Sequence, residues 1–242
     1  MANYIVTDTE LTSIANAIRA KGGTSGSLVF PSGFVSAIEN ISGGGLPDAY
    51  QEVDYLQSTG TQYIDTGLTG DIDTEWIVEF SDFDRNGNNY AGPFGIAATG
   101  AKVIVVCGGQ VRVYTSFGNK QDVYYNTATA SATEWATSTK RKISISKNGV
   151  YEDDTQKLAA YDNPTYSSSN LTMVIFARKE SDGTVGTMIG TKIYSFVCKK
   201  NGTELAHFVP CYRKSDNEPG MYDTVSGEFF TNDGTGSFTI PS

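Results

Sequence analysis

The feature that most constrains this fold is the short glycine run from Ser42 to Leu46, because the residue pattern changes across it. Before the run, apolar residues recur at helical spacing. After it, apolar and polar residues alternate between many turn signals. Glycine-rich joints are flexible and commonly separate units with their own cores. The sequence therefore predicts a small helical unit over residues 1–42, a linker over 43–47 and a β domain over 48–242.

The first unit is predicted to be a helix–loop–helix. Thr7 and Glu10 have the spacing of a capping box, and a second helical pattern begins near Pro31. A unit this small rarely buries enough apolar surface to be stable alone, so we expect its apolar stripes to pack on other subunits or on another protein. Packing back onto its own β domain is the alternative. The stripe residues are Leu11, Ile14, Ile18, Phe34, Ile38 and Ile41.

The second unit reads as a mainly β domain. Residues Trp76–Phe80 alternate as one strand, Asn148-Gly149 and Asn201-Gly202 are hairpin signals, and Leu171–Ala177 is continuously apolar. Ten or more short strands without alternating helices favour a two-sheet antiparallel sandwich of the jelly-roll type.

Composition narrows the function classes. The net charge is −9 with no basic stripe, which argues against nucleic-acid binding and against anionic membranes. No apolar segment is long enough to span a bilayer, and the first residues lack the pattern of a signal peptide. The three cysteines are expected to be free thiols, although the spacing leaves a Cys198–Cys211 disulfide open.

Several segments are similar to those of a known group of proteins. Residues 50–67 (YQEVDYLQSTGTQYIDTG) resemble the opening of concanavalin A/laminin-G-like domains in tail and fibre proteins of phages and prophages of gut Firmicutes. Residues 207–216 (HFVPCYRKSD) and 220–225 (GMYDTV) resemble the end of those domains. In the helical unit, residues 7–22 (TDTELTSIANAIRAKG) and 30–38 (FPSGFVSAI) resemble the N-terminal segments of such proteins. The resemblance implies a laminin-G-like sandwich with a structural or adhesive role and no shared catalytic residues.

Two polar patterns are candidates for a chemical role. Asp82, Asp84 and Asn86 match the start of a calcium loop, but Pro93 occupies the place of its bidentate Glu, so an acidic turn is the preferred interpretation and no cofactor is predicted. Strand alternation places Glu79 and Asp82 on opposite faces, which disfavours a glycoside hydrolase.

The remaining candidates are histidine and aromatic residues. His207, the single histidine, lacks a nucleophile motif and is expected to be structural. Tyrosine and asparagine in turns are suited to sugar binding, whereas most other aromatic residues are expected to pack in the core or on the sheets. The predicted sugar-binding residues are Asn88, Asn89, Tyr90, Tyr124 and Tyr125.

These observations lead to one functional expectation. We expect a non-enzymatic phage virion protein of tail fibre, baseplate or head fibre, assembled in the bacterial cytoplasm and displayed on the virion surface. Its partners would be other virion proteins, further copies of itself (a trimer, by analogy with fibres) and a host-surface glycan. A purely structural decoration subunit is the first alternative, and a glycan-acting hydrolase is the second.

Overall fold

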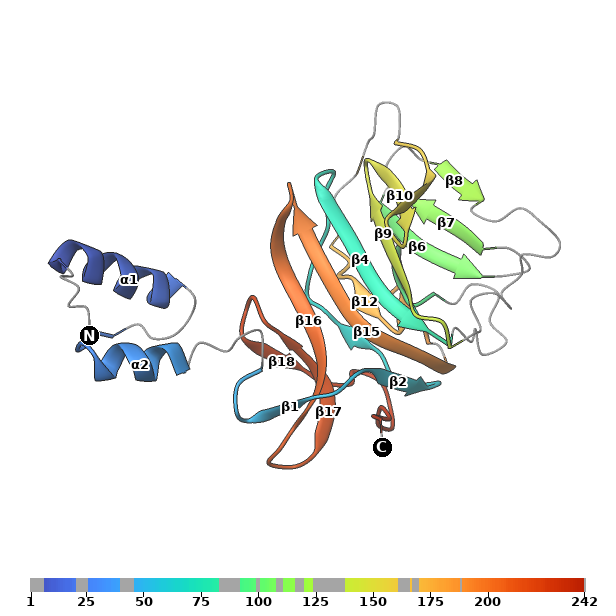
Figure 1. Ribbon diagram of the computed structural model, residues 1–242. Helices are drawn as coiled ribbons and strands as arrows, with labels where there is room; N and C mark the ends of the chain where they lie inside the picture. The colour runs from blue at the N-terminus through green and yellow to red at the C-terminus, as the bar shows by residue number, and fades with distance from the viewer. Residues whose placement is uncertain are drawn as a thin grey trace. The chain divides into compact units, whose positions relative to one another are not determined.

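A computed structural model provides the fold and describes residues 7–20, 26–39, 46–82, 92–98, 101–107, 111–115, 120–123, 138–160, 166, 170–187 and 189–241. Contacts between residues divide the chain into two compact units, Met1–Asp48 and Ala49–Ser242. The first unit contains two helices, and the second contains the strands (Figure 1). No helix in the described part of the chain is long and apolar enough to cross a membrane.

The helical unit consists of α1 (Asp8–Ala20) and α2 (Ser32–Glu39). The predicted capping box is present: the Thr7 N–H donates to Glu10 Oε2 at 2.7 Å, and the Glu10 N–H donates to Thr7 Oγ1 at 3.3 Å. The hydrogen bond from the Thr7 backbone lowers the pKa of the Glu10 carboxyl group. Helix α1 therefore begins where the sequence predicted.

The two helices pack on each other through a small core. Its buried residues are Ala15, Ile18, Phe34 and Ala37, with Leu11 and Leu28 packed against them. Three residues of the predicted stripe, Leu11, Ile18 and Phe34, thus serve the packing of the unit itself. Ile14 lies on a different side of α1 and is 46% exposed. Ile41 and the side chain of Ile38 lie outside the described residues.

Within the described residues, the strands form two sheets. The ten-stranded sheet is antiparallel and contains β1 (Tyr50–Glu52), β2 (Leu56–Thr59), β4 (Thr74–Ser81), β9 (Arg141–Ser146), β10 (Gly149–Glu152), β11 (Thr155–Leu158), β15 (Ile189–Lys200), β16 (Thr203–Arg213), β17 (Glu218–Asp223) and β18 (Glu228–Phe230). The eight-stranded sheet contains β3 (Ile64–Asp65), β5 (Phe94–Ala98), β6 (Ala101–Cys107), β7 (Val111–Thr115), β8 (Lys120–Val123), β12 (Val174–Ile175), β13 (Ala177–Glu180) and β14 (Val185–Thr187).

The long strands β9, β4, β15 and β16 lie side by side in the ten-stranded sheet (Figure 1). The alternation predicted along β4 is confirmed, because Trp76, Val78 and Phe80 are fully buried while Ile77 and Glu79 are half-exposed. One face of this strand therefore points into the core, and the other forms the outer surface of the sheet.

The two predicted hairpins in this sheet are also confirmed. β9 and β10 pair antiparallel on either side of Lys147 and Asn148, and β15 pairs with β16 across Asn201 and Gly202. Asn201 and Gly202 have φ angles of 50° and 79°. Two consecutive positive φ angles are typical of the tight turns that join antiparallel strands.

Both sheets contribute to one core, and Phe196 is a fully buried member of it. The Phe196 ring lies 6.0 Å from Trp76, 5.9 Å from Phe208 and 5.7 Å from Phe94, measured between ring centroids. Trp76 and Phe208 belong to the ten-stranded sheet, and Phe94 belongs to the eight-stranded sheet. The predicted mainly β fold with two sheets is therefore confirmed.

The eight-stranded sheet is mixed, which corrects the prediction of an entirely antiparallel sandwich. β12 pairs antiparallel with β5, whereas β13 pairs parallel with the same strand, opposite Ile96. The chain reverses direction at Phe176, whose φ is 65°. Its ring is fully buried, 4.7 Å from Phe238 between centroids, and this burial offsets the cost of a left-handed backbone. Leu171–Ala177, predicted as one strand, is therefore broken at Phe176.

Aromatic contacts tie β1 to β17 and β18. The Tyr50 ring lies 4.8 Å from Tyr222 and 4.9 Å from Phe229. Gly220 of β17 lies so close to β18 that a Cβ atom there would overlap the Phe230 carbonyl oxygen. This corner of the sheet thus depends on a residue without a side chain.

Cys198 and Cys211 are free and buried, so the disulfide that the sequence left open is not formed. Burial raises the pKa of both thiols to about 12. The thiols are therefore protonated at neutral pH, a state in which they are poor nucleophiles. The side chain of Cys107 lies outside the described residues.

Candidate functional site

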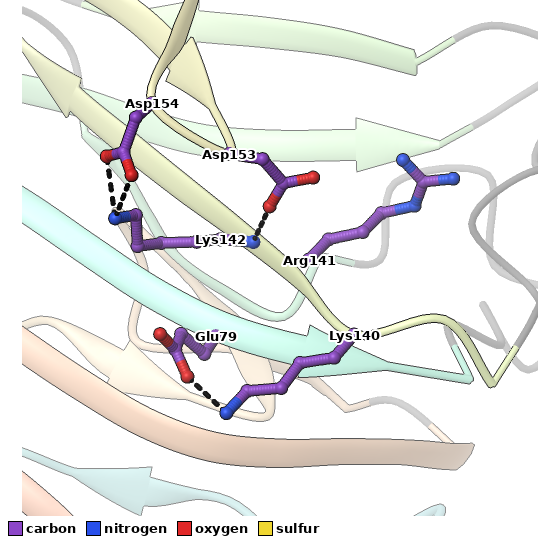
Figure 2. A pocket seen from close by; sticks show the side chains of 6 residues that line it. All are labelled: Glu79, Lys140, Arg141, Lys142, Asp153 and Asp154. Carbon is purple, nitrogen blue, oxygen red and sulfur yellow. Dashed lines mark hydrogen bonds and ion pairs between the residues drawn. The ribbon is translucent and has the colours of Figure 1, made fainter.

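The outer surface of the ten-stranded sheet carries a pocket of about 330 Å³ lined by charged residues. We call it the charged pocket. Its lining residues are Glu79 of β4, Lys140, Arg141 and Lys142 at the start of β9, and Asp153 and Asp154 of the turn between β10 and β11 (Figure 2). A volume of this size lies at the lower end of pockets that hold small ligands.

Strand register and a tight turn bring these residues together. Glu79 of β4 lies directly opposite Lys142 of β9. The β10–β11 turn consists of Asp153 and Asp154, with φ angles of 48° and 64°, and Asp is among the residues that tolerate this conformation. The Asp153 N–H donates to the Lys142 carbonyl oxygen at 2.9 Å, and the Lys142 N–H donates to Asp153 Oδ1 at 2.8 Å. These two hydrogen bonds fix the turn against β9.

The two lysines of the charged pocket are ion-paired within it. Lys140 Nζ lies 2.5 Å from Glu79 Oε2, and Lys142 Nζ lies 2.6 Å from Asp154 Oδ1. Figure 2 shows both pairs. The side chain of Lys140 is 52% exposed and that of Asp154 is 81% exposed, so both remain accessible to a ligand.

Arg141 has a different role. Its side chain extends away from those of Lys140 and Lys142 (Figure 2), and its Nη1 lies 2.6 Å from Glu152 Oε1. Glu152 is 3% exposed, and Lys157 Nζ lies 3.5 Å from its other oxygen. A buried carboxylate needs such counter-charges. This cluster therefore neutralises a buried carboxylate of β10, whereas the two lysines form the accessible part of the pocket.

Two tyrosines lie beside the charged pocket. The rings of Tyr55 and Tyr194 meet edge to face at 5.7 Å between centroids. Lys140 Nζ lies 4.7 Å from the centroid of Tyr194, and Lys192 Nζ lies 4.8 Å from that of Tyr55. Tyr194 is also held through its hydroxyl, 2.9 Å from Ser81 Oγ. We call Tyr55, Tyr194, Lys140 and Lys192 the tyrosine–lysine patch, which is continuous with the pocket through Lys140.

Asp82 joins this surface through a break in the strand. Strand alternation predicted that Asp82 and Glu79 point to opposite faces, and the structure corrects that prediction. Strand β4 ends at Ser81, and Asp82 has a φ of 52°, so the alternation stops before it. Its carboxylate accepts a hydrogen bond from Ser81 Oγ at 2.9 Å and lies 3.0 Å from Lys192 Nζ, above Tyr55. The hydrogen bond to Asp82 raises the pKa of Lys192.

The residues predicted to bind sugar lie outside the described part of the chain. They are Asn88, Asn89, Tyr90, Tyr124 and Tyr125. The same holds for Asp84 and Asn86 of the calcium-loop pattern. Among the described residues, no cluster of three or more His, Cys, Asp or Glu side chains could hold a metal ion. His207 is half-buried in β16, and its backbone N–H donates to Asp223 Oδ1 at 2.8 Å.

The sequence reasoning missed the charged pocket and the tyrosine–lysine patch. Tyr55 and Tyr194 lie far apart in the chain, and only the pairing of β15 with β2 and β4 brings them together. A local signal existed at Asp153-Asp154, because consecutive Asp residues between alternating segments are typical of a two-residue turn.

Comparison of the chain with protein-family models and with curated proteins finds no match. The resemblance to phage tail and fibre proteins therefore rests on the sequence segments themselves. Three of these segments are neighbours in the fold, because β1 pairs with β16, and β16 pairs with β17.

Proposed function

We propose that this chain is a non-enzymatic structural protein of a phage virion, with a jelly-roll sandwich of the concanavalin A/laminin-G type. The helical unit attaches the chain to the particle, and the sandwich is displayed on the virion surface for adhesion to host glycans. Tail fibre, baseplate and head fibre are the substructures in which such a protein would serve.

One observation carries the proposal: the helical unit leaves large apolar side chains on its surface. Val29, Phe30 and Val35 are 70%, 59% and 52% exposed, and Ile14 is 46% exposed. Residues 26–38, which include three of these four, contain no charged residue. An apolar, uncharged surface on so small a unit is typical of a protein–protein interface.

The net charge of −9 bears on the choice of partner. Copies of this chain carry the same net charge and repel one another. The repulsion is weakest where two uncharged surfaces meet, and the segment 26–38 has no charged residue. We therefore propose that the helical unit associates with further copies of itself, in a trimer by analogy with fibres, and docks on another virion protein.

The described outer surface favours adhesion over hydrolysis. Glu79 and Asp82, the two carboxylates that flank the tyrosine–lysine patch, are each ion-paired with a lysine. A glycosidase needs one carboxyl group that carries a proton to donate. Tyrosine rings beside hydrogen-bonding groups, by contrast, are suited to holding a sugar.

The attachment role can be tested with surface variants of the helical unit. Val29→Asp with Val35→Asp places charge on the exposed apolar surface and leaves the small core intact. We expect monomers in sedimentation and loss of the chain from purified particles in antibody-labelled electron micrographs. Thr9→Asp places a charge at an exposed position of α1 outside the segment 26–38; it is the control and should retain assembly. Incorporation of the double variant at the normal level, or absence of the unmodified chain from particles, would contradict the proposal.

A further inference from the structure

We propose that the charged pocket and the adjoining tyrosine–lysine patch form a binding site for an uncharged sugar unit of a glycan. This inference rests on the proposed adhesive function and names both the site and its ligand class. The sugar packs against Tyr55 and Tyr194 beside the ammonium groups of Lys192 and Lys140, and it places its hydroxyl groups in the pocket between β4, β9 and the β10–β11 turn.

The first argument is the balance of charge among the described residues of this surface. Five cations and five carboxylates lie in or directly around it. The cations are Lys140, Arg141, Lys142, Lys157 and Lys192, and the carboxylates are Glu79, Asp82, Glu152, Asp153 and Asp154. An anionic or cationic ligand would meet as many like charges as opposite ones. A neutral ligand loses nothing by this balance.

The second argument is the hydrogen-bonding capacity that remains in the pocket. An ammonium group has three donors and a carboxylate has about four acceptor sites. The ion pairs Lys140–Glu79 and Lys142–Asp154 use only part of that capacity. A sugar hydroxyl is both donor and acceptor, so it can accept from a lysine and donate to a carboxylate without breaking either ion pair.

The third argument is the rigid position of the aromatic surface. Tyr194 is held by Ser81 through its hydroxyl and by Tyr55 through an edge-to-face contact. Lys140 Nζ lies 4.7 Å from the Tyr194 ring centroid and 2.5 Å from Glu79 Oε2, so its ammonium group is already in place to donate to a sugar hydroxyl beside the ring. A ring that is already fixed loses little conformational freedom when the C–H face of a sugar packs against it.

The pocket volume limits the ligand size. About 330 Å³ is suited to one or two sugar rings rather than to a long polysaccharide segment. A single shallow site of this kind should bind at roughly millimolar Kd, so attachment of a particle depends on many copies.

The experiment uses the full chain, displayed in many copies on beads, on an array of neutral glycans (glucans, galactans and mannans) and anionic ones (polygalacturonate and heparin). We expect binding to one or more neutral glycans and at least tenfold weaker binding to every anionic glycan. Tyr194→Ala should reduce that binding at least tenfold. Tyr194→Phe, which keeps the ring and loses only the hydroxyl, should retain most of it.

Two further variants separate the site from general effects. Glu79→Gln leaves Lys140 without its partner carboxylate and should increase binding to anionic glycans at least threefold. Tyr212→Ala changes a half-buried tyrosine of β16 that is not a member of the patch, and it should leave binding unchanged once its near-ultraviolet circular dichroism matches the unmodified chain.

Several results would overturn the inference. They are a preference of the unmodified chain for anionic glycans, unchanged binding in a folded Tyr194→Ala, or no binding to any glycan at high bead density. None of these results bears on the proposed structural role in the virion, because antibody labelling of particles tests that role separately.

Discussion

Replacing Phe196 with alanine tests whether the two sheets depend on one shared core. Phe196 is 0% exposed, and its ring contacts two aromatic residues of its own sheet and Phe94 of the other sheet. Alanine would remove all three ring contacts and leave a cavity between the layers. Because β15 is paired on both sides, by β4 and β16, the backbone has little freedom to close that cavity.

The expected loss follows from these contacts. Phe→Ala changes in protein cores cost about 3–5 kcal/mol, and the cost is highest where the site cannot collapse. We therefore expect a decrease of about 4–5 kcal/mol in the free energy of unfolding. With a urea m-value of about 2.5 kcal/mol per molar, the midpoint should fall by roughly 2 M. Phe196→Leu fills most of the cavity and should lose only about 1–1.5 kcal/mol.

Urea unfolding of the full chain, followed by near-ultraviolet circular dichroism, measures these shifts. Leu205→Ala, at a position that is 44% exposed, is the control and should change the free energy of unfolding by less than about 0.5 kcal/mol. Phe34→Ala in the helical unit should leave the same transition unchanged, because Phe34 belongs to a separate core. A midpoint shift below about 0.5 M for Phe196→Ala, at unchanged m, would refute the reasoning.

Three other properties follow from the structure. In a Cys107→Ser background, Cys198 and Cys211 should resist a thiol reagent at pH 8, because burial raises the pKa of both thiols to about 12. Both should react fully once urea unfolds the chain. Rapid labelling of the folded chain would contradict this. Burial tends to raise the pKa of Asp65, but hydrogen bonds from Lys179 and Thr172 hold it below its ordinary value of 3.8. Its stabilising effect should therefore be present above that value and be lost as the pH falls further, so Asp65→Asn should flatten the acid limb of a plot of urea midpoint against pH. Gly220→Ala should destabilise the β17–β18 pairing by about 1–3 kcal/mol, measured by urea unfolding, since its Cβ overlaps backbone.

The parts of the fold that depend on local pattern could be predicted from the sequence. The alternation of Trp76, Val78 and Phe80 determined one strand, and two Asn-Gly dipeptides determined two hairpins. The mixed pairing of β12 and β13 could not be predicted, because the reversal falls on Phe176, a residue with no preference for left-handed backbone. The continuous apolar pattern of Leu171–Ala177 indicates burial, and most of the segment is buried. The same pattern is expected whether the segment forms one strand or is broken, so it does not predict the reversal.

The candidate site was less predictable than the fold. Turn composition directed attention to tyrosine and asparagine in loops, whereas the described tyrosine–lysine patch lies on and beside strands. Tyr55 and Tyr194 meet only after the ten-stranded sheet has formed. Asp82 reaches the same surface only because its φ is positive. Strand alternation assumes an extended backbone and therefore does not predict this position.

The left-handed backbone at Phe176 determines which substitutions this position tolerates during evolution. At an ordinary buried position, alanine is tolerated better than glycine. Here alanine would empty the space beside Phe238 and keep the backbone cost of about 1–2 kcal/mol, whereas glycine would empty the space and remove that cost. The order of tolerance is therefore inverted, and large apolar residues remain the best occupants. The change of strand direction in the eight-stranded sheet is therefore maintained by the packing of the core rather than by a turn-forming residue.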